Sequence, residues 1–593
     1  MESRSPGIRC GLCAFLLAAT WLHGAAYAAV AEAAAADAAA TVFYDGQVFT
    51  AERDRPYAEA LAIRGDRILA VGVFADVERA AGPRARRVDL KGRFLMPGMI
   101  DAHAHPVTGG LTLIQANFPE AGGNVAGLAR YARQELRKGE SRQGEVLVIN
   151  GLDLGYWTHT IELEAALSQG EFAATPVVLW GSDGHTAWAN RPARARAGIT
   201  AEFIRSLDPN ARRFYGVDAA LNPNGFVVDA GLERLQNSVP PPSPATLLKA
   251  GRAALRYLNG LGITAWLDAA VSGHVAGTAP AKADDPGYLP VYRTLSQRGE
   301  LTAHVVAYPV VQPDAGFQQI DVIEALRRRF ADIPDFKIPG LKVFADGVVE
   351  IPAQTAALSH PYVNNGRAVK TLFTPEKMNA LVVEAYRRGL TVHVHAIGDL
   401  AVKGALDAFE AARRANPGTR LPMVLTHAQF VDPEDIPRFG QLHVIAALQL
   451  LWADGEESTI DQVQPYIDPR IYRWMYPARS ILDTDGEIAG ASDWPVSSAD
   501  PFEAMAVAET RKGPKGVLDA AQRVPREVML YAYTRNAAEV LDELDEIGTL
   551  APGKRADLVL IDRDVLTVPV TQLAKAKVVF TMFGGRLVYG REP

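Results

Sequence analysis

Eight short apolar segments recur along the chain, and most of them are separated by stretches with a helical pattern. Each segment is rich in β-forming residues and ends at a glycine or a polar break, as buried strands do. The segments lie at residues 93–105, 262–270, 302–310, 340–347, 390–399, 422–430, 443–452 and 486–495. Strands that alternate with helices pair in parallel, and eight of them predict an α/β fold with a (β/α)8 TIM-type barrel.

Both ends of the chain fall outside this series. Residues 41–97 and 546–593 alternate apolar and polar positions around hairpin-like glycines, which is typical of antiparallel strands. We expect these two parts to form one small β-sandwich domain, with the barrel between them over residues 98–545 and a closing helical segment at 525–544. Residues 106–261 are too many for one barrel loop, so they predict a long insertion after the first strand that covers the site.

The first 28 residues have the order of a signal peptide. Arg4 and Arg9 form a basic start, and an apolar run and the small-residue cleavage site "AYA" follow. The apolar run is too short for a permanent membrane span, and the strict order disfavours the alternative of a buried N-terminal helix. We expect residues 1–28 to be a signal peptide, residues 29–40 a disordered alanine-rich linker, and the protein to be exported (bacterial, periplasmic or secreted).

Both cysteines, Cys10 and Cys13, lie in the predicted signal peptide, so the mature chain would have neither disulfides nor thiolate metal ligands. Cleavage would remove two arginines and one glutamate and change the formal net charge from −7 to −8. This balance disfavours nucleic acid and anionic membranes as partners, and no later apolar run reaches transmembrane length. We expect a small-molecule substrate, no nucleic acid and no membrane contact after cleavage, while homo-oligomerisation stays open.

The sequence "DAHAHP" places His103 and His105 one residue apart at the end of the first predicted strand. Side chains at i and i+2 of a strand share a face, so both can reach one metal ion. Twelve histidines make one such pair expected by chance with a probability of roughly a quarter, so the motif alone is weak. Active sites of barrel enzymes lie at the C-terminal ends of the strands. Residues with ligand chemistry recur along or at the end of further strands: Lys342, His395, His427 and Asp493.

The chain resembles the amidohydrolase superfamily, specifically amidohydrolase family 3, the YtcJ-like branch of metal-dependent hydrolases. The resemblance runs from about residue 41 to the C-terminus, and its motifs stand in the order of the family. They are "MPGMIDAHAHP", "GLDLGYWTH", "SDGHTAWAN", "LKVFADG", "VHVHAIGD", "THAQ", "SDWPV" and "GTLAPGKRADLVLID".

This resemblance implies two divalent metal ions, and it assigns a role to each ligand-type residue. His103, His105 and Asp493 would hold the more buried ion, and His395 and His427 the second. Lys342 would bridge the two as a carbamate formed with CO2, because an ammonium group cannot ligate a cation. Imidazole and carboxylate ligands without thiolate suit Zn2+, with other divalent ions as alternatives.

The chemistry that the resemblance implies is hydrolysis. Two metal ions would share a bridging hydroxide, lower its pKa and polarise the scissile carbonyl. Asp493 would be the catalytic residue that accepts a proton from this hydroxide and delivers it to the leaving group. Lys342 has an alternative reading as a structural lysine that is paired with a carboxylate such as Asp346.

Further residues could line the site. The resemblance suggests that His185 contacts the substrate, with packing inside the insertion as the alternative. Asp346 and Asp399 are expected near the strand ends, where orientation of a histidine is favoured over ligation, and Asp346 is also a candidate substrate contact. His393 is expected to be a core histidine. An apolar substrate pocket could be lined by aromatic residues that core packing would explain equally well, namely Tyr156, Trp157, Trp188 and Trp494.

The predicted function is that of an exported metal-dependent amidohydrolase. It would hydrolyse a C–N bond other than a peptide bond, in an amide, N-formyl or N-acyl group of a small molecule. A ring-amidine deaminase is the close alternative, although that chemistry usually uses one metal and no bridging lysine. A non-catalytic regulatory homologue should have lost ligands, and a solute-binding protein should show two similar lobes. The stretch "ADGVVEIPAQTAAL" departs from the family pattern beside the site, so the substrate cannot be carried over.

Overall fold

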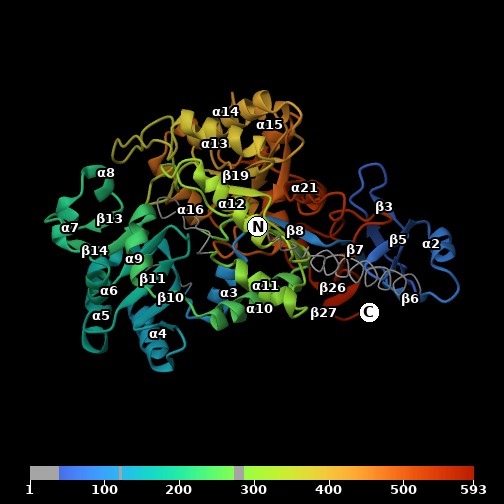
Figure 1. The fold of residues 1–593 in the computed structure, drawn as a ribbon, viewed down its shortest axis with the longest axis horizontal. Coiled ribbons are helices and arrows are strands. Elements are labelled where there is room, and N and C mark those ends of the chain that lie inside the picture. Colours follow the sequence, from blue (N-terminus) through green and yellow to red (C-terminus); the bar gives the residue numbers. More distant parts are fainter. Residues whose placement is uncertain (1–38, 119–122, 273–285) are drawn as a thin grey trace, which may run out of the picture.

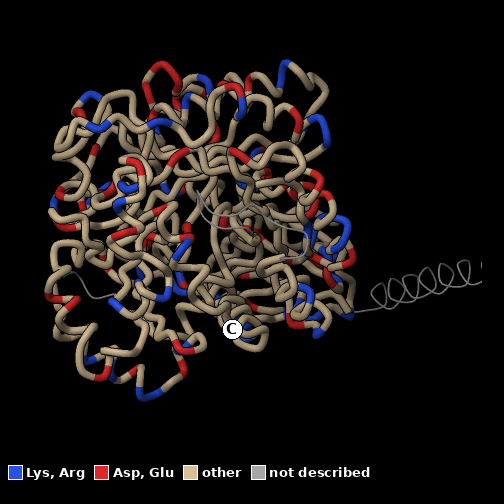
Figure 2. The backbone as a smooth tube through the Cα atoms, turned by 60° about the vertical axis from the view of Figure 1, so that its left-hand side comes forward, with Lys and Arg blue, Asp and Glu red and all other residues tan. Residues whose placement is uncertain are grey.

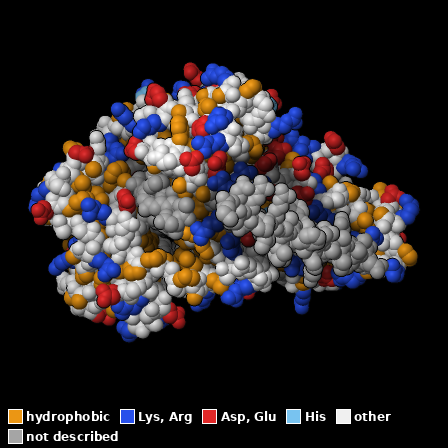
Figure 3. Space-filling model, in the orientation of Figure 1, with side chains coloured by type: hydrophobic (Ala, Val, Ile, Leu, Met, Phe, Trp, Pro, Cys, Tyr) orange, Lys and Arg blue, Asp and Glu red, His pale blue; other side chains and the backbone are white. Residues whose placement is uncertain are grey.

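The computed structural model describes residues 39–118, 123–272 and 286–593. The predicted signal peptide and most of the predicted linker lie outside the described residues. Among the described residues, no helix combines the length and the apolar character that a membrane span requires. Acidic and basic residues are interspersed along the described chain (Figure 2), and charged and apolar side chains mix on the face shown in Figure 3.

Two parallel sheets form the centre of the fold (Figure 1). The first has the order β17-β16-β15-β8, with β8 at Met99–Ala104, β15 at Ile263–Asp268, β16 at His304–Ala307 and β17 at Phe336–Lys337. The second follows the sequence order, with β18 at Gly340–Phe344, β19 at Thr391–Ala396, β20 at Met423–His427, β21 at Val444–Leu448 and β22 at Glu487–Gly490. The chain is therefore an α/β protein, and each of the eight predicted strand segments contains a parallel strand.

Backbone hydrogen bonds join the two sheets at both edges. On one side the Lys342 N–H donates to the Pro309 carbonyl at 2.9 Å, which links β18 to the segment after β16. On the other side the Asp493 N–H donates to the His103 carbonyl at 2.8 Å, which links the segment after β22 to β8. The carboxyl ends of the first and last parallel strands therefore lie side by side.

The helices between the strands are defined by their caps and by their apolar faces. In α13 (Pro375–Arg387), the Thr374 side chain accepts the Lys377 N–H, and a proline occupies the first turn. The next helix, α14 (Asp399–Ala415), buries alanine, valine, leucine and phenylalanine side chains along one face. Both helices pack against β19, which is buried over its whole length and is rich in β-branched residues.

Residues from the two ends of the chain share one six-stranded sheet. Its order is β27-β26-β25-β7-β2-β3, with β2 at Gln47–Phe49, β3 at Tyr57–Ala58, β7 at Phe94–Pro97, β25 at Leu558–Ile561, β26 at Val578–Phe583 and β27 at Arg586–Gly590. A four-stranded sheet lies beside it in the order β5-β4-β1-β6, with β1 at Thr41–Tyr44, β4 at Ala60–Arg64, β5 at Arg67–Gly72 and β6 at Arg86–Asp89. One buried apolar cluster contains Phe43 and Leu61 from the smaller sheet and Leu95 and Leu558 from the larger one.

One expectation from the sequence is corrected, and two parts of the fold gain detail. The segment 93–105 is two strands, because the chain passes at Gly98 from β7 in the chain-end sheet to β8 in the central one. A Cβ atom on Gly98 would lie 2.0 Å from Thr264 Oγ1, so only glycine fits this crossing. A helix that was not expected, α2 (Phe74–Ala81), covers the smaller sheet, and the closing helical segment is two short helices, α20 (Arg526–Ala532) and α21 (Arg535–Val540).

The stretch after β8 carries its own sheet and helices. Helix α3 (Pro106–Ile114) follows β8 directly, and α10 (Pro244–Gly260) packs against it before the chain re-enters the central sheet. Between them lies a six-stranded sheet of order β13-β14-β12-β11-β10-β9, with β9 at Arg142–Gln143, β10 at Val146–Leu152, β11 at Val177–Gly181, β12 at Thr186–Ala189, β13 at Tyr215–Val217 and β14 at Pro223–Val228. Helices α4 (Val125–Lys138), α5 (Thr160–Leu167) and α9 (Leu232–Ser238) pack against this sheet.

A buried histidine connects the central sheet to the chain-end sheet. His304, the first residue of β16, has Nε2 2.8 Å from Asp557 Oδ2 and Nδ1 3.3 Å from Asp335 Oδ1. The other oxygen of Asp557 accepts the Gly584 N–H at 2.7 Å. Burial alone would lower the pKa of His304, but Asp557 and Asp335 outweigh it and raise the pKa to about 9.

We expect His304→Gln to lower the thermal midpoint by a few degrees at pH 6 and by much less at pH 9.5. A raised pKa means that the ion pair stabilises the fold fully below the unfolded pKa near 6.5, and that this contribution is lost as the pH rises through about 9. The difference between wild type and variant, measured by calorimetry at both pH values, checks this. An equal loss at both pH values would mean that the charge of His304 does not contribute.

Candidate metal centre

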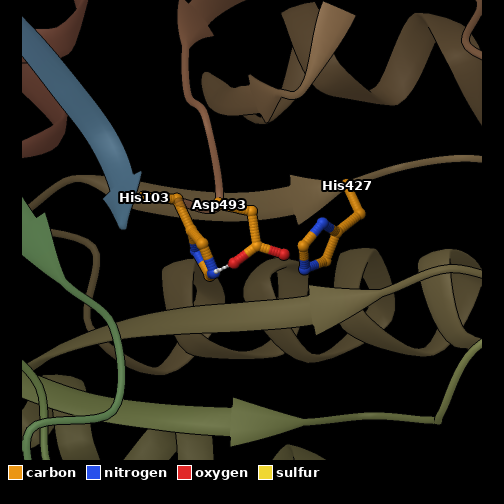
Figure 4. A group of neighbouring side chains, drawn as sticks. All are labelled: His103, His427 and Asp493. Carbon is orange, nitrogen blue, oxygen red and sulfur yellow. Dashed lines mark ion pairs between the residues drawn. The ribbon is translucent and has the colours of Figure 1, made fainter. Parts of the chain in front are cut away.

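Three buried side chains converge beyond the carboxyl ends of the parallel strands (Figure 4). His103 comes from β8, His427 is the last residue of β20, and Asp493 follows β22. One ligand atom from each lies within 4.8 Å of the other two, which is close enough for one metal ion to contact all three. The structure therefore brings together residues that are up to 390 positions apart in the chain, and it does so at one end of the strands.

The Asp493 carboxylate lies at the centre of this group. Its Oδ1 is 3.2 Å from Nε2 of His103 and 3.1 Å from Nε2 of His105. Burial would raise the pKa of Asp493, but the hydrogen bond and charge of His105, together with His427 and Lys342, lower it below the usual value. The aspartate is therefore ionised, and it can accept a cation or a proton.

Two of the three side chains are held by an unusual backbone. His427 has φ = 74° and Asp493 has φ = 57°, in the left-handed region that residues other than glycine rarely adopt. Such a conformation costs about 1–3 kcal/mol and persists where the surrounding structure imposes it. At both strand ends the backbone is bent in the way that turns a potential ligand toward the common centre.

His395 lies next to His427 on the neighbouring strand β19. The two ring centroids are 4.5 Å apart, and Nε2 of His395 is 3.2 Å from the Gly347 carbonyl oxygen. Burial, with His427 and Lys342 nearby, lowers the pKa of His395 well below its usual value. Burial has the same effect on His103 and His427, so these histidines are neutral, which is the form that ligates metals.

Lys342 has no exposed surface, and its Nζ makes no hydrogen bond to any of the described residues. The nitrogen lies 4.8 Å from the centre of the Phe344 ring. Burial lowers the pKa of Lys342 to about 7. The alternative pairing with Asp346 is wrong, because the Asp346 carboxylate accepts three backbone N–H groups instead, from Ala357, Ile397 and Gly398, at 2.8–3.0 Å.

The donor set fits a divalent metal ion. Imidazole and carboxylate groups without thiolate are the ligands of catalytic zinc and related ions. The Lys342 amine lies beside these donors, buried and without a hydrogen bond to any described residue. A purely structural role does not explain such a group, because buried polar groups are normally hydrogen-bonded.

A family model described as "Amidohydrolase family" matches residues 86–589. The chain belongs to the amidohydrolase family.

Two relatives and one solved structure show the breadth of this family. The chain is 25% identical over 574 residues to the N-substituted formamide deformylase of Arthrobacter pascens, covering 92% of this chain and 98% of the relative. It is 27% identical over 416 residues to the exoenzymes regulatory protein AepA of Pectobacterium carotovorum subsp. carotovorum, covering 68% and 83%. The fold matches an uncharacterised metal-dependent hydrolase from Pyrococcus horikoshii OT3 with a TM-score of 0.68 and 22% identity, over 90% of this chain and 99% of that one.

In this amidohydrolase, the insertion contributes a histidine to the surroundings of the metal centre. The ring of His185 lies 5.8 Å from that of His395, and its Nδ1 is 2.7 Å from Oδ1 of Asp229. Burial alone would lower the pKa of His185, but Asp229 outweighs it and raises the pKa to about 9. The insertion therefore presents a positively charged imidazole to the candidate centre.

The predicted aromatic lining is divided between two places. Trp494 follows Asp493 directly and stacks on Tyr257 of α10, with ring centroids 4.9 Å apart. Tyr156 is buried in the apolar core of the insertion, and Trp157 packs at the edge of that core against Phe226. Trp188 is also fully buried there. The structure explains these three residues of the insertion as packing, and substrate contact by Tyr156 or Trp157 stays a prediction.

The two acidic residues expected near the strand ends support loops. Oδ1 of Asp346 is 3.7 Å from Nε2 of His395, and burial raises the pKa of Asp346 to about 7. Asp399 begins α14 and accepts the Ser359 N–H at 2.9 Å. Whether Asp346 also contacts a substrate stays a prediction.

Three supporting residues were missed by the analysis of the sequence. Asp101 on β8 accepts the N–H groups of His103 and Ser492 at 3.1 and 3.0 Å, as well as the Ser492 hydroxyl. Gln449 Oε1 is 2.9 Å from Nδ1 of His427, and Asp229 holds His185. Of these three, only Asp101 could have been recognised from the sequence, because it lies two residues before His103 and therefore on the same face of the strand.

We expect Gly109→Ala to destabilise the protein by about 1–3 kcal/mol, because a Cβ atom there would lie 2.4 Å from Cζ3 of Trp494. Gly404→Ala is the matched control: Gly404 is also helical, and nothing lies within 4 Å of its added Cβ, so it should be neutral or stabilising by up to about 1 kcal/mol. Denaturant unfolding and near-ultraviolet circular dichroism measure the two effects. Equal stability of the two variants would contradict the packing of Trp494 on α3.

Proposed function

We propose that this chain is a metal-dependent hydrolase of a C–N bond in an amide, N-formyl or N-acyl group of a small molecule. The observation that carries the proposal is the convergence of His103, His427 and Asp493 within 4.8 Å in a member of the amidohydrolase family. The relative whose name is N-substituted formamide deformylase supports the choice of bond. Export of the mature chain from residue 29, with a small-molecule substrate and neither nucleic acid nor a membrane as partner, belongs to the same proposal, and homo-oligomerisation stays open.

The proposal includes a closed (β/α)8 barrel. The hydrogen bonds that join the two parallel sheets at both edges support closure, since an open sheet would leave these edges unpaired. The apolar cluster shared by the two chain-end sheets supports their packing as a β-sandwich.

Two divalent ions, with zinc favoured by the donors, would be held by the chain's own residues. His103, His105 and Asp493 would hold one ion, and His395 and His427 the other. A carbamate on Lys342 would bridge them. The neutral amine of Lys342 would add to CO2 with loss of one proton, and the resulting carbamate would place a negative charge between the two sites. Its complete burial without a partner among the described residues supports this role.

Divalent ions held by these residues would supply a hydroxide nucleophile at neutral pH and polarise the scissile carbonyl. Asp493 would accept the proton of this hydroxide and deliver it to the leaving nitrogen, which departs as an amine. His185, held by Asp229, donates a hydrogen bond to the substrate from the insertion side. Trp494, next to Asp493, forms part of an apolar wall.

We expect the metal-loaded protein to hydrolyse members of a panel of N-formyl amines, N-acyl amino acids and dipeptides, and to lose activity on treatment with a chelator. Asp493→Asn should lower kcat by about 100- to 10,000-fold on the best substrate, because general acid–base catalysis is worth that much. Asp485→Asn is the matched control, since Asp485 also has a positive φ, at 58°, but is exposed. Equal losses in both variants would contradict the role of Asp493.

We expect Lys342→Ala to retain about one metal ion per chain where the wild type holds two, and to lose activity by several orders of magnitude. Removal of the bridge weakens the second site, while His103, His105 and Asp493 still hold the first. Elemental analysis and turnover measure this, and a short carboxylic acid should restore part of the activity. The exposed Lys370→Ala serves as the control. Two metal ions and full activity in Lys342→Ala would make Lys342 a structural residue.

A regulatory function is the second candidate, and it is favoured by the name of the relative AepA. The ligand-type residues of this chain are complete, which favours an enzyme. Metal binding by the wild type without turnover of any member of the panel would favour the regulatory function instead.

A further inference from the structure

His393 lies one step below His395 on β19, on the same face of the strand. It has no exposed surface, and it pairs in register with Lys342 on the neighbouring strand β18. The sequence predicts a core histidine at this position, and burial agrees with that prediction. Its Nε2 lies at hydrogen-bond distance from another histidine, whereas its Nδ1 is buried and has no hydrogen-bond partner among the described residues, so the Nε2 contact determines what His393 does.

One partner of His393 is a candidate metal ligand. Its Nε2 lies 2.7 Å from Nδ1 of His103, and the two ring planes are inclined by 28° with centroids 4.9 Å apart. On the other side of the His103 ring, Nε2 lies 3.2 Å from Oδ1 of Asp493. His103 thus has one nitrogen in the candidate centre and the other against His393.

This arrangement fixes the tautomer of His103 once a metal is bound. A nitrogen that ligates a metal carries no proton, so neutral His103 carries its proton on Nδ1. That N–H points at Nε2 of His393, which must then be the acceptor and carry its own proton on Nδ1. The two neutral rings therefore form a chain in which His393 orients His103.

The other histidines of the centre are oriented in different ways. Nδ1 of His427 lies 2.9 Å from the side-chain oxygen of Gln449, and Nε2 of His395 lies 3.2 Å from the Gly347 carbonyl. Both partners present an oxygen atom to the histidine nitrogen. For His103 the acceptor is another imidazole, which fits between two strands where a carboxylate would add a buried negative charge.

We propose that His393 is a positioning residue of the metal centre, whose Nε2 accepts the Nδ1 proton of His103 and so directs Nε2 of His103 to the metal. This inference rests on the proposed function, because it requires a metal at His103. It predicts that loss of the acceptor weakens metal binding even though His393 itself contacts no metal. Groups that orient metal-ligating histidines are worth about 10- to 100-fold in metal affinity.

The test compares three variants with the wild type. His393→Leu keeps an apolar side chain of similar size but removes the acceptor, and His393→Gln restores an oxygen acceptor at a similar reach. Thr391→Val removes a buried hydrogen bond of the same strand, between Thr391 Oγ1 and the Tyr308 hydroxyl at 2.7 Å, and keeps His393 and its contact with His103; it also controls for disturbance of Tyr308, whose ring lies 5.8 Å from that of His393. Zinc affinity is measured by competition with a chromophoric chelator, the visible spectrum of the cobalt-loaded proteins reports ligand geometry, and thermal melting of the metal-free proteins reports folding.

We expect His393→Leu to bind zinc about 10- to 100-fold more weakly at unchanged stoichiometry, with an altered cobalt spectrum. His393→Gln should lie within about threefold of the wild type, and Thr391→Val should lose thermal stability but keep its zinc affinity. Wild-type affinity in His393→Leu would overturn this inference alone. So would equal weakening in His393→Gln or Thr391→Val, or the loss of a whole equivalent of metal in both His393 variants. A wild type that binds no zinc would overturn the proposed function as well.

Discussion

The carboxylate of Asp101 is the interaction on which the candidate centre depends. It lies on the first parallel strand and binds the backbone of both His103 and Ser492, so it ties the first strand to the segment that follows the last one. Burial raises the pKa of Asp101 to about 6, which shows how much solvation it has lost. A buried carboxylate with several donors is expensive to disturb, and this one holds the segment before Asp493 beside His103, in addition to the direct hydrogen bond from the Asp493 N–H to the His103 carbonyl.

Burial also determines which chemistry the site can perform. A histidine in water is partly charged near neutral pH and ligates a metal poorly, whereas His103, His395 and His427 are kept neutral by desolvation. The same desolvation lowers the pKa of Lys342 to about 7. His185 shows the opposite outcome, because Asp229 keeps it charged inside the same environment. Neutral histidines and a charged one therefore lie side by side in the candidate centre, with the rings of His185 and His395 5.8 Å apart.

The peripheral parts of the chain are coupled to this centre through short connections. Gly98 alone separates the chain-end sheet from the strand that carries His103, and Trp494 packs between the start of the insertion and Tyr257 at its end. The insertion brings His185 to the centre by way of Asp229. A substitution far from the strand ends can therefore displace residues of the candidate centre. The close contact at Gly98 and the stacking of Trp494 on Tyr257 leave no space for the neighbouring groups to adjust.

The sequence by itself determined what depends on local order: the shared face of His103 and His105, and the alternation of strands with helical stretches such as α14. The tertiary structure decided which distant groups meet. His393 and His103, which are in contact, are 290 residues apart in the sequence. Nothing in the sequence indicates that His185 and Asp229 form a pair. The close approach of Thr264 to Gly98, which leaves no room for a Cβ atom where β7 passes into β8, is likewise a feature of the packed fold alone. Periodicity sets the face on which a side chain lies, whereas its partners depend on distances between strands that only the packed fold defines.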